Sequence, residues 1–205
     1  MSVAWLTPFL AYLLGSIPFG YLLVKLVAGR DIRTEGSGNI GAANVSRQAG
    51  PVAGMLTLLL DAGKGYAGVW LAARLTGENV SWMMAAALAA LLGHLFPVFL
   101  RFRGGRGVAT GAGVFLPLCW QAVLAALAVW AAAVAVWRYV SLGSVLAAGA
   151  LPVFMQVLYA PGYAPPLVVS LGTIAAAMLI IVRHRANIER LVAGTEPKFT
   201  LRRDG

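Results

Sequence analysis

Long apolar stretches alternate along this chain with short polar connections. Most of these stretches approach the ~20 residues that an α-helix needs to cross ~30 Å of hydrocarbon. The pattern predicts an all-α, polytopic membrane bundle that occupies residues 1–205 as one domain. The predicted apolar stretches are residues 3–28, 52–73, 81–100, 107–117, 118–137, 140–159 and 164–182.

The composition favours the same fold class. Hydrophobic residues make up 60% of the chain, mean hydropathy is +0.81, and charged residues make up 11%, against about 25% in soluble domains. The one cysteine, Cys119, excludes an intrachain disulfide and a multi-cysteine metal site. No histidine is close to it in sequence to activate the thiol, so we do not expect a cysteine nucleophile.

Basic residues are concentrated in alternate connections, and the net charge is +9. Beside membrane spans, such residues indicate the cytoplasmic side rather than a nucleic-acid partner. Arg74 alone lies in a connection of opposite parity. We therefore expect the N-terminus outside and the C-terminus in the cytoplasm. The basic residues on the cytoplasmic side are Arg30, Arg33, Arg47, Arg101, Arg103, Arg106, Arg138, Arg183, Arg185, Arg190, Lys198, Arg202 and Arg203.

Residues 107–137 begin and end on the same predicted side. They satisfy that parity only as two passes, and Pro117 is the expected break. Because 107–117 is too short for a full span, we expect a short helix that enters the bundle from the cytoplasm. The predicted total is about seven transmembrane helices.

A glycine-rich stretch, GSGNIGAANVSR at residues 36–47, follows the first predicted span. Glycines let backbone amides approach a ligand, and successive amides can form an anion-binding nest. Ser37, Asn39 and Asn44 add polar side chains, and Arg47 can donate two hydrogen bonds to a phosphate. The stretch lacks the GxxxxGK[ST] pattern of nucleoside-triphosphate sites. A flexible polar linker remains an alternative.

A second cluster, RGGRGVATGAG at residues 103–113, again combines glycine with arginine. We expect a helix to begin directly after Arg106, where free amides and partial positive charge favour an anion. Arg106 is the candidate ligand of this cluster. Topology and lipid headgroup contact explain Arg101 and Arg103.

The two histidines, His94 and His184, both lie at predicted cytoplasmic ends of spans. Ionisable residues there are functional candidates, although a satisfied core histidine is the alternative. Asn187 follows His184 by three residues and shares its helix face. Asp61 and Lys64, also three apart, predict a buried ion pair, because burying either charge alone is costly, and a role in holding the active-site loops is the second interpretation.

Together, the clusters resemble the bacterial acyl-phosphate-dependent glycerol-3-phosphate acyltransferases, known as PlsY. That family's pattern contains GSGNxGAxNxxR, GHxFPxxxxFxGGKGVAT, YVSL and RHxxNIxRLxxGxExK. This chain has GSGNIGAANVSR, GHLFPVFLRFRGGRGVAT, YVSL and RHRANIERLVAGTEPK, in the same order and spacing between residues 36 and 198. The departure is Arg106, where the family pattern has lysine.

The resemblance implies an enzyme of the bacterial inner membrane whose active site faces the cytoplasm. It would transfer a fatty acyl group from acyl phosphate to the sn-1 hydroxyl of glycerol 3-phosphate. The products would be lysophosphatidic acid and inorganic phosphate, in the first step of phospholipid synthesis. The implied partners are both substrates, membrane lipid, and a phosphate acyltransferase that makes acyl phosphate.

The resemblance also implies roles for individual residues. Ser37, Gly38, Asn39 and Gly41 would hold the acyl phosphate, and His94 would orient the reacting groups. Arg47, Arg106, Ser141, His184 and Asn187 would bind glycerol 3-phosphate. The expected catalytic residues are Ser37, His94, Arg106, His184 and Asn187, and the expected substrate-binding residues are Gly38, Asn39, Gly41, Asn44, Arg47, Gly104, Gly105, Gly107 and Ser141.

We expect direct attack by the glycerol hydroxyl, because an acyl phosphate has a good leaving group and needs mainly positioning and charge stabilisation. The substrate phosphate would accept the proton. With two histidines and scattered acids, neither a metal site nor a cofactor is expected. A transporter of phosphorylated solutes is an alternative, but the sequence shows no internal repeat. A structural subunit would leave the three clusters unexplained.

Overall fold

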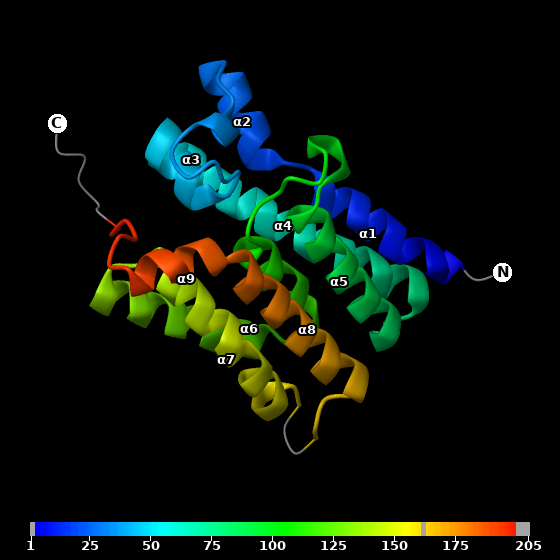
Figure 1. Ribbon diagram of the computed structural model, residues 1–205. Helices are drawn as coiled ribbons and strands as arrows, with labels where there is room; N and C mark the ends of the chain where they lie inside the picture. Colours follow the sequence, from blue (N-terminus) through cyan, green and yellow to red (C-terminus); the bar gives the residue numbers. More distant parts are fainter. Residues whose placement is uncertain (1–2, 161–162, 200–205) are drawn as a thin grey trace. The chain divides into compact units, whose positions relative to one another are not determined.

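The computed structural model describes residues 3–160 and 163–199 (Figure 1). Within these ranges the chain is all-α, as predicted, with one isolated bridge between Ala160 and Tyr163. Arg202 and Arg203 of the predicted cytoplasmic tail lie outside the described residues. The α-helices are α1 (Leu6–Ser16), α2 (Phe19–Ala28), α3 (Ala42–Ala49), α4 (Pro51–Thr76), α5 (Val80–Leu95), α6 (Val108–Trp137), α7 (Val140–Leu158), α8 (Leu167–Arg183) and α9 (Arg185–Val192), and short 3-10 helices cover Val3–Trp5, Ile32–Thr34 and Val98–Leu100.

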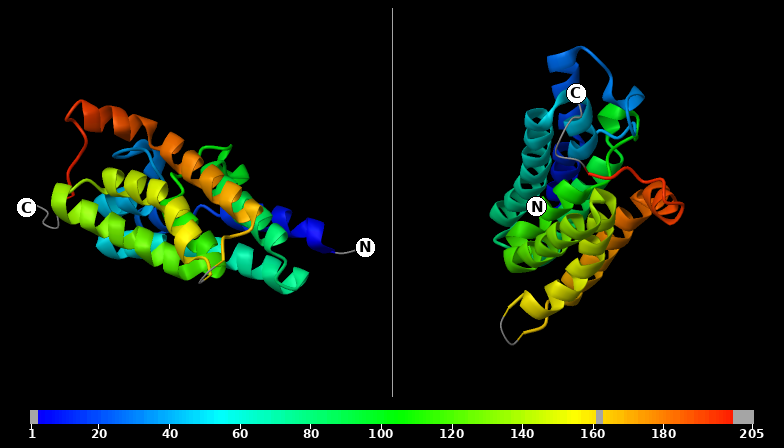
Figure 2. Two further views of the ribbon diagram at one scale, coloured as in Figure 1. Left: turned by 90° about the horizontal axis from the view of Figure 1, so that it is seen from below. Right: turned by 90° about the vertical axis from the view of Figure 1, so that its left-hand side faces the viewer.

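The chain forms two compact units, Met1–Leu118 and Cys119–Gly205. In the first unit, α1, α4 and α5 pack side by side (Figure 1). In the second, α7 packs against α8, and α9 contacts both helices (Figure 2). A single functional domain over the whole chain stays a prediction.

The units divide inside α6, where the backbone of Cys119 leaves the helical region at φ −162 and ψ 88. Pro117 lies two residues earlier, and a proline inside a helix removes one backbone hydrogen bond and crowds the preceding turn. The expected break near Pro117 is confirmed. That it separates two membrane passes stays a prediction.

Four helical stretches in the described residues are long and apolar enough to cross a membrane. A fifth is added if α8 and α9, which meet at a 57° bend, count as one span. α4 is not among them, since it carries Asp61 and Lys64 in its middle. The predicted seven spans and the orientation of the termini stay predictions. The four stretches are Val3–Ala28, Val80–Leu100, Val108–Trp137 and Val140–Leu158.

The hydropathy pattern suggested one continuous helix over residues 3–28, but the structure has two. α1 ends at Ser16 and α2 begins at Phe19. Pro18 explains the break, because it has no backbone N–H and pushes the preceding residue into extended backbone. Ile17 is extended, at φ −63 and ψ 115, and its carbonyl accepts a hydrogen bond from the Lys64 ammonium at 2.7 Å.

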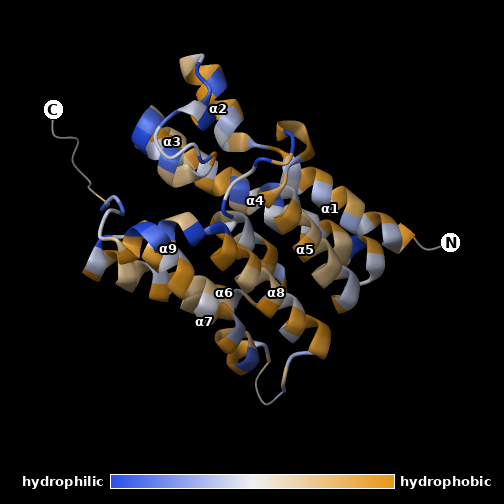
Figure 3. Ribbon diagram, in the orientation of Figure 1, coloured by the Kyte–Doolittle hydropathy of each residue, from blue (hydrophilic) through white to orange (hydrophobic). Residues whose placement is uncertain are grey.

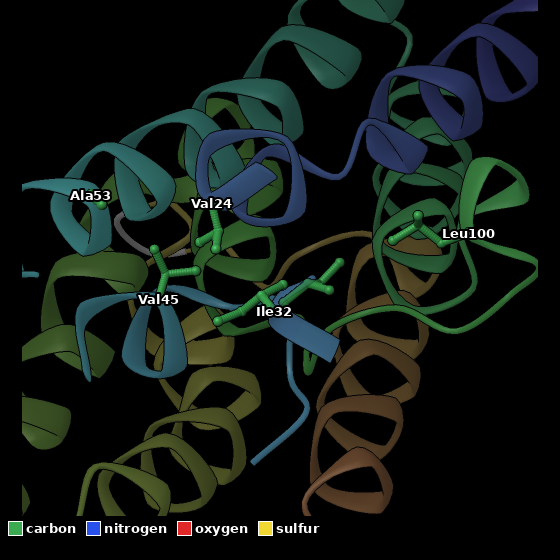
Figure 4. Packing of buried hydrophobic residues seen from close by; sticks show 6 residues of the cluster. Val24, Ile32, Val45, Ala53 and Leu100 are labelled. Atoms are coloured by element: carbon green, nitrogen blue, oxygen red, sulfur yellow. The ribbon is translucent and has the colours of Figure 1, made fainter. Parts of the chain in front are cut away.

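The connection at 29–50, predicted as a loop, contains a 3-10 turn and the helix α3. α3 has a larger share of hydrophilic residues than the long helices, as does α9 (Figure 3). Its apolar Val45 nevertheless joins a buried cluster with residues of α2, α4 and two connections (Figure 4). This packing explains a helix too short for sequence periodicity to show. The cluster comprises Val24, Ile32, Ile40, Val45, Ala53 and Leu100.

Close approach of backbones joins α1 to α5. A Cβ atom built on Gly15 would overlap the carbonyl of Ala90, and one built on Gly93 would overlap the carbonyl of Tyr12. Small residues allow such contacts between helices in lipid, where packing replaces the hydrophobic effect. The two glycines therefore set the α1–α5 distance.

We expect Gly15→Ala to destabilise the fold by about 1–3 kcal/mol, because the added methyl group must push backbone away. The matched control is Gly63→Ala in α4, where no atom lies within 4 Å of the added Cβ. That change should leave stability equal or higher, since alanine favours a helix by about 1 kcal/mol over glycine. Thermal unfolding in detergent compares the two. Equal midpoints would contradict the close α1–α5 contact.

Candidate functional site

The buried side chain of Asn44 organises the glycine-rich loop of residues 35–41. Its Oδ1 accepts from the amide of Ser37 at 3.1 Å, and its Nδ2 donates to the carbonyls of Glu35 at 3.1 Å and Asn39 at 2.9 Å. Asn44 is 1% exposed. The loop is therefore braced from within, and a flexible linker does not describe it.

The outer side of this loop remains open. Ser37 and Gly38 are exposed. Gly38 has φ +67, a left-handed conformation that favours glycine. Asn39 accepts from the amide of Gly41 at 3.1 Å, which directs the chain into α3. Arg47 lies exposed in the last turn of α3. The loop thus presents the Ser37 hydroxyl on a fixed frame, while the amides of Ser37, Gly38 and Gly41 donate to partners in the loop and in α3.

The acids beside this loop are engaged by arginines. Arg30 pairs with Glu35 at 3.0 Å and donates to the Gln48 carbonyl at 3.1 Å. On the exposed edge, Asp31 and Arg33 pair at 2.6 Å. Hydrogen bonds from the Arg33 side chain and backbone lower the pKa of Asp31 to about 2. The Asp31 carboxylate is therefore not suited to accept a proton near neutral pH.

The predicted ion pair between Asp61 and Lys64 is confirmed and is buried. Lys64 Nζ lies 2.7 Å from Asp61 Oδ1, and the side chains are 2% and 3% exposed. His94, from the last turn of α5, places its Nδ1 3.6 Å from the same carboxylate oxygen. α4 and α5 thus bring an acid, a base and an imidazole together inside the first unit.

The RGGRG turn packs directly against His94. The Gly105 amide donates to the His94 carbonyl at 3.1 Å, and a Cβ on Gly105 would overlap the Nε2 edge of the imidazole. Gly104 faces the same carbonyl. Arg106 is partly exposed, and Gly107, at φ +86, leads into α6 at Val108. The predicted helix start after Arg106 is confirmed.

The second unit has its own polar cluster, centred on Glu196. The Glu196 carboxylate accepts from Asn187 Nδ2 at 2.7 Å and from Arg190 Nε at 2.7 Å. Burial alone would raise the pKa of Glu196. Proximity to the Ser141 hydroxyl and the bonds from Asn187 and Arg190 lower it overall, so the group stays ionised.

The Glu196 bond fixes the orientation of the Asn187 amide. A carboxylate can only accept, so the amide nitrogen must face Glu196 and the oxygen must face away. Asn187 Oδ1 is buried and has no hydrogen-bond partner in the described residues. The Ser141 hydroxyl oxygen is also buried, and although it lies near Glu196 it makes no hydrogen bond within these residues. Buried polar atoms usually find a partner, so these two are candidates for ligand contact.

His184 lies at the junction of α8 and α9, one turn before Asn187. Its Nδ1 lies 2.8 Å from the Ile180 carbonyl, which can only accept. Nδ1 therefore carries a proton, and Nε2 is the nitrogen that remains for other contacts. The side chain is buried at 2% exposure.

The expected site residues thus fall into three groups. The first group lies in the braced loop and α3 and comprises Ser37, Gly38, Asn39, Gly41, Asn44 and Arg47. The second lies at the end of α5 and in the turn before α6 and comprises His94, Gly104, Gly105, Arg106 and Gly107. The third lies in the second unit and comprises Ser141, His184 and Asn187. Sequence reasoning assigned no role to Glu196, and for Asp61 and Lys64 it gave an internal ion pair first and a role in holding the active-site loops second. The available signal for Glu196 was its place in the family pattern RHxxNIxRLxxGxExK.

Comparison with known proteins gives the family. The sequence model described as Glycerol-3-phosphate acyltransferase matches residues 5–194. The glycerol-3-phosphate acyltransferase of Trichlorobacter lovleyi is 51% identical over 189 residues, which are 92% of this chain and 94% of that protein. That of Jannaschia sp. is 48% identical over 194 residues, or 95% and 92% of the two chains.

Two crystal structures of PlsY (YgiH), an integral membrane glycerol 3-phosphate acyltransferase, have the same fold. The glycerol 3-phosphate form has a TM-score of 0.89 and 41% identity, and covers 96% of each chain. The lysophosphatidic acid form has a TM-score of 0.85 and 39% identity, and covers 96% of this chain and 95% of that one. This chain belongs to the glycerol-3-phosphate acyltransferase family, as an all-helical, multi-pass integral membrane protein of the PlsY type.

Proposed function

We propose that this protein transfers a fatty acyl group from acyl phosphate to the sn-1 hydroxyl of glycerol 3-phosphate. The product would be lysophosphatidic acid. The similar PlsY structures, in glycerol 3-phosphate and lysophosphatidic acid forms, support this acceptor and this product. The observation that carries the proposal is the glycine-rich loop, which Asn44 braces internally while Ser37 and Gly38 stay exposed. Such a frame suits a phosphate beside a membrane.

The acyl phosphate rests on Ser37, Gly38, Asn39 and Gly41 in this proposal. The amides of Ser37, Gly38 and Gly41 already donate to other protein groups, so the donors offered to its phosphate are the Ser37 hydroxyl and the first backbone amides of α3. Basic side chains serve the second phosphate, that of glycerol 3-phosphate. Arg47 and Arg106 are the candidates, because a guanidinium can donate two parallel hydrogen bonds to phosphate oxygens.

In the second unit, Ser141, His184 and Asn187 serve the glycerol 3-phosphate. Asn187 Oδ1 is held as an acceptor by the Glu196 bond, so it suits a hydroxyl group rather than a phosphate oxygen. The Ser141 oxygen lies buried in the same cluster. A site with buried acceptors would reject an analogue that lacks the matching hydroxyl.

Acyl transfer proceeds by direct attack in this proposal. The glycerol hydroxyl oxygen bonds to the acyl carbon, the bond from that carbon to the phosphate oxygen breaks, and the proton passes to the departing phosphate. A serine nucleophile needs an adjacent base. No imidazole or carboxylate hydrogen-bonds to Ser37 Oγ in residues 3–160 and 163–199. His94 would orient the reacting groups, and positioning with charge stabilisation would supply the barrier reduction.

The proposed location is the bacterial inner membrane, with the site facing the cytoplasm. The basic connections support this orientation through the positive-inside rule. The donor would come from a phosphate acyltransferase that makes acyl phosphate, and the product would leave into membrane lipid.

A donor assay tests this function. Purified protein in lipidic micelles receives glycerol 3-phosphate with palmitoyl phosphate, palmitoyl-CoA or palmitoyl-acyl carrier protein in separate reactions. We expect lysophosphatidic acid and inorganic phosphate from palmitoyl phosphate alone. Product from palmitoyl-CoA alone would support glycerol 3-phosphate as the acceptor and would contradict acyl phosphate as the donor. Folded protein inactive with all three donors would favour a transporter, which uptake into vesicles would test.

Arg106 provides a second test. Arg106→Met should lower kcat/KM for glycerol 3-phosphate by about 10- to 100-fold, since hydrogen bonds to charged groups contribute about 1.5–3 kcal/mol. Arg106→Lys keeps the charge and should stay within about tenfold of wild type. Arg103→Met is the matched control, because that side chain is exposed in the same turn. Equal losses at Arg103 and Arg106 would contradict a specific phosphate contact.

A further inference from the structure

We propose that Asp61 is a positioning residue for the acyl transfer: it fixes the imidazole of His94, which in turn holds the turn that carries Arg106. The juxtaposition is one carboxylate facing both Lys64 Nζ at 2.7 Å and His94 Nδ1 at 3.6 Å. Asp61 touches no substrate in this scheme. The activity test of this inference rests on the proposed function. A second test, by NMR of the imidazole, needs no substrate and does not depend on that function.

The carboxylate determines which imidazole nitrogen carries a proton. The nearest Asp61 oxygen lies beyond direct hydrogen-bond distance of the ring, but a carboxylate that can only accept favours a proton on the nitrogen that faces it. That nitrogen is Nδ1. The Nε2 edge then faces the RGGRG turn at Gly105. Asp61 thus sets both the direction and the tautomer of the ring, as carboxylates do for imidazoles in other sites.

The imidazole and the turn cannot move independently. Gly105 is buried, its amide donates to the His94 carbonyl, and even a methyl group on Gly105 would overlap the ring. A rotated imidazole would therefore displace Gly105 and the next residue, Arg106. Misplacement of a binding group by about 1 Å can cost on the order of 10²-fold in rate.

Lys64 holds the Asp61 carboxylate in place. Its ammonium spans Asp61 and the Ile17 carbonyl, both at 2.7 Å. Removing one member of a buried pair leaves an uncompensated charge and destabilises a protein, whereas replacing both members with apolar residues of similar volume is often neutral. Removing the pair as a whole therefore separates a stability role from a positioning role.

The experiment compares two double variants. Asp61→Leu/Lys64→Met removes both charges and the acceptor for His94, while Asp61→Asn/Lys64→Met removes the charges and keeps an acceptor oxygen. We expect the Leu/Met variant to fold but to lose kcat/KM on the order of 10²-fold with palmitoyl phosphate and glycerol 3-phosphate. The kcat/KM of the Asn/Met variant should be at least about tenfold higher than that of the Leu/Met variant.

¹⁵N NMR of the imidazoles gives a measurement that needs no substrate. A His184→Gln background, used for spectra only, leaves His94 as the single histidine. We expect a protonated Nδ1 in that parent and in the Asn/Met variant, and a changed tautomer in the Leu/Met variant. An unprotonated Nδ1 in the parent would overturn the proposal even if the Leu/Met variant did not fold.

A matched control removes an exposed ion pair in the same way. Asp31→Asn/Arg33→Met deletes the pair at the edge of the first unit and should keep wild-type activity and the His94 spectrum. Equal activity of the two Asp61 double variants, or wild-type activity in the Leu/Met variant, would overturn the positioning role. Inactivity of the wild type with palmitoyl phosphate would instead count against the proposed function, while the spectra would still test Asp61.

Discussion

The buried ion pair of Lys64 with Asp61 connects the helices of the first unit, and the other contacts described there depend on it. An ammonium buried in a helical bundle costs several kcal/mol unless partners surround it. Lys64 finds them in the Asp61 carboxylate and in the Ile17 carbonyl, which is available because Pro18 breaks the helix there. One charge therefore links α4 to the α1–α2 junction. The same carboxylate faces His94 at the end of α5.

The same kind of side-chain arrangement occurs in both units. In each, a buried acid that is paired with a cation also orients a polar side chain of the candidate site. Asp61 pairs with Lys64 and faces His94, while Glu196 pairs with Arg190 and fixes the Asn187 amide. Acids held in this way are poor proton acceptors. Their arrangement favours a reaction in which the protein positions phosphates and leaves the proton to the substrate.

The sequence predicted those parts of the site that depend on local patterns. The spacing of Asp61 and Lys64 predicted their ion pair, the glycines around Arg106 predicted the start of α6, and Pro117 predicted the break before Cys119. Each of these follows from one helix turn or one proline. The roles of individual site residues, by contrast, came from the resemblance and stay predictions.

Features that depend on packing between distant segments were missed. α3 forms because Val45 packs with Val24 and Ala53, and its eight residues are fewer than the roughly 11–18 over which a helical period is read from sequence. The break at Pro18 was lost in the average hydropathy of residues 3–28. Glu196 lies nine residues after its partner Asn187, so no local spacing rule connects them.

The central claim is that acyl transfer is direct, with the protein supplying positions and charges rather than a nucleophile. Rapid-quench kinetics with ³²P-labelled palmitoyl phosphate tests it most directly. Without glycerol 3-phosphate, we predict no burst of phosphate and no acyl group on the protein; phosphate should appear only with the acceptor. A burst that matches the enzyme concentration, with an acyl group on Ser37 by mass spectrometry, would contradict the account.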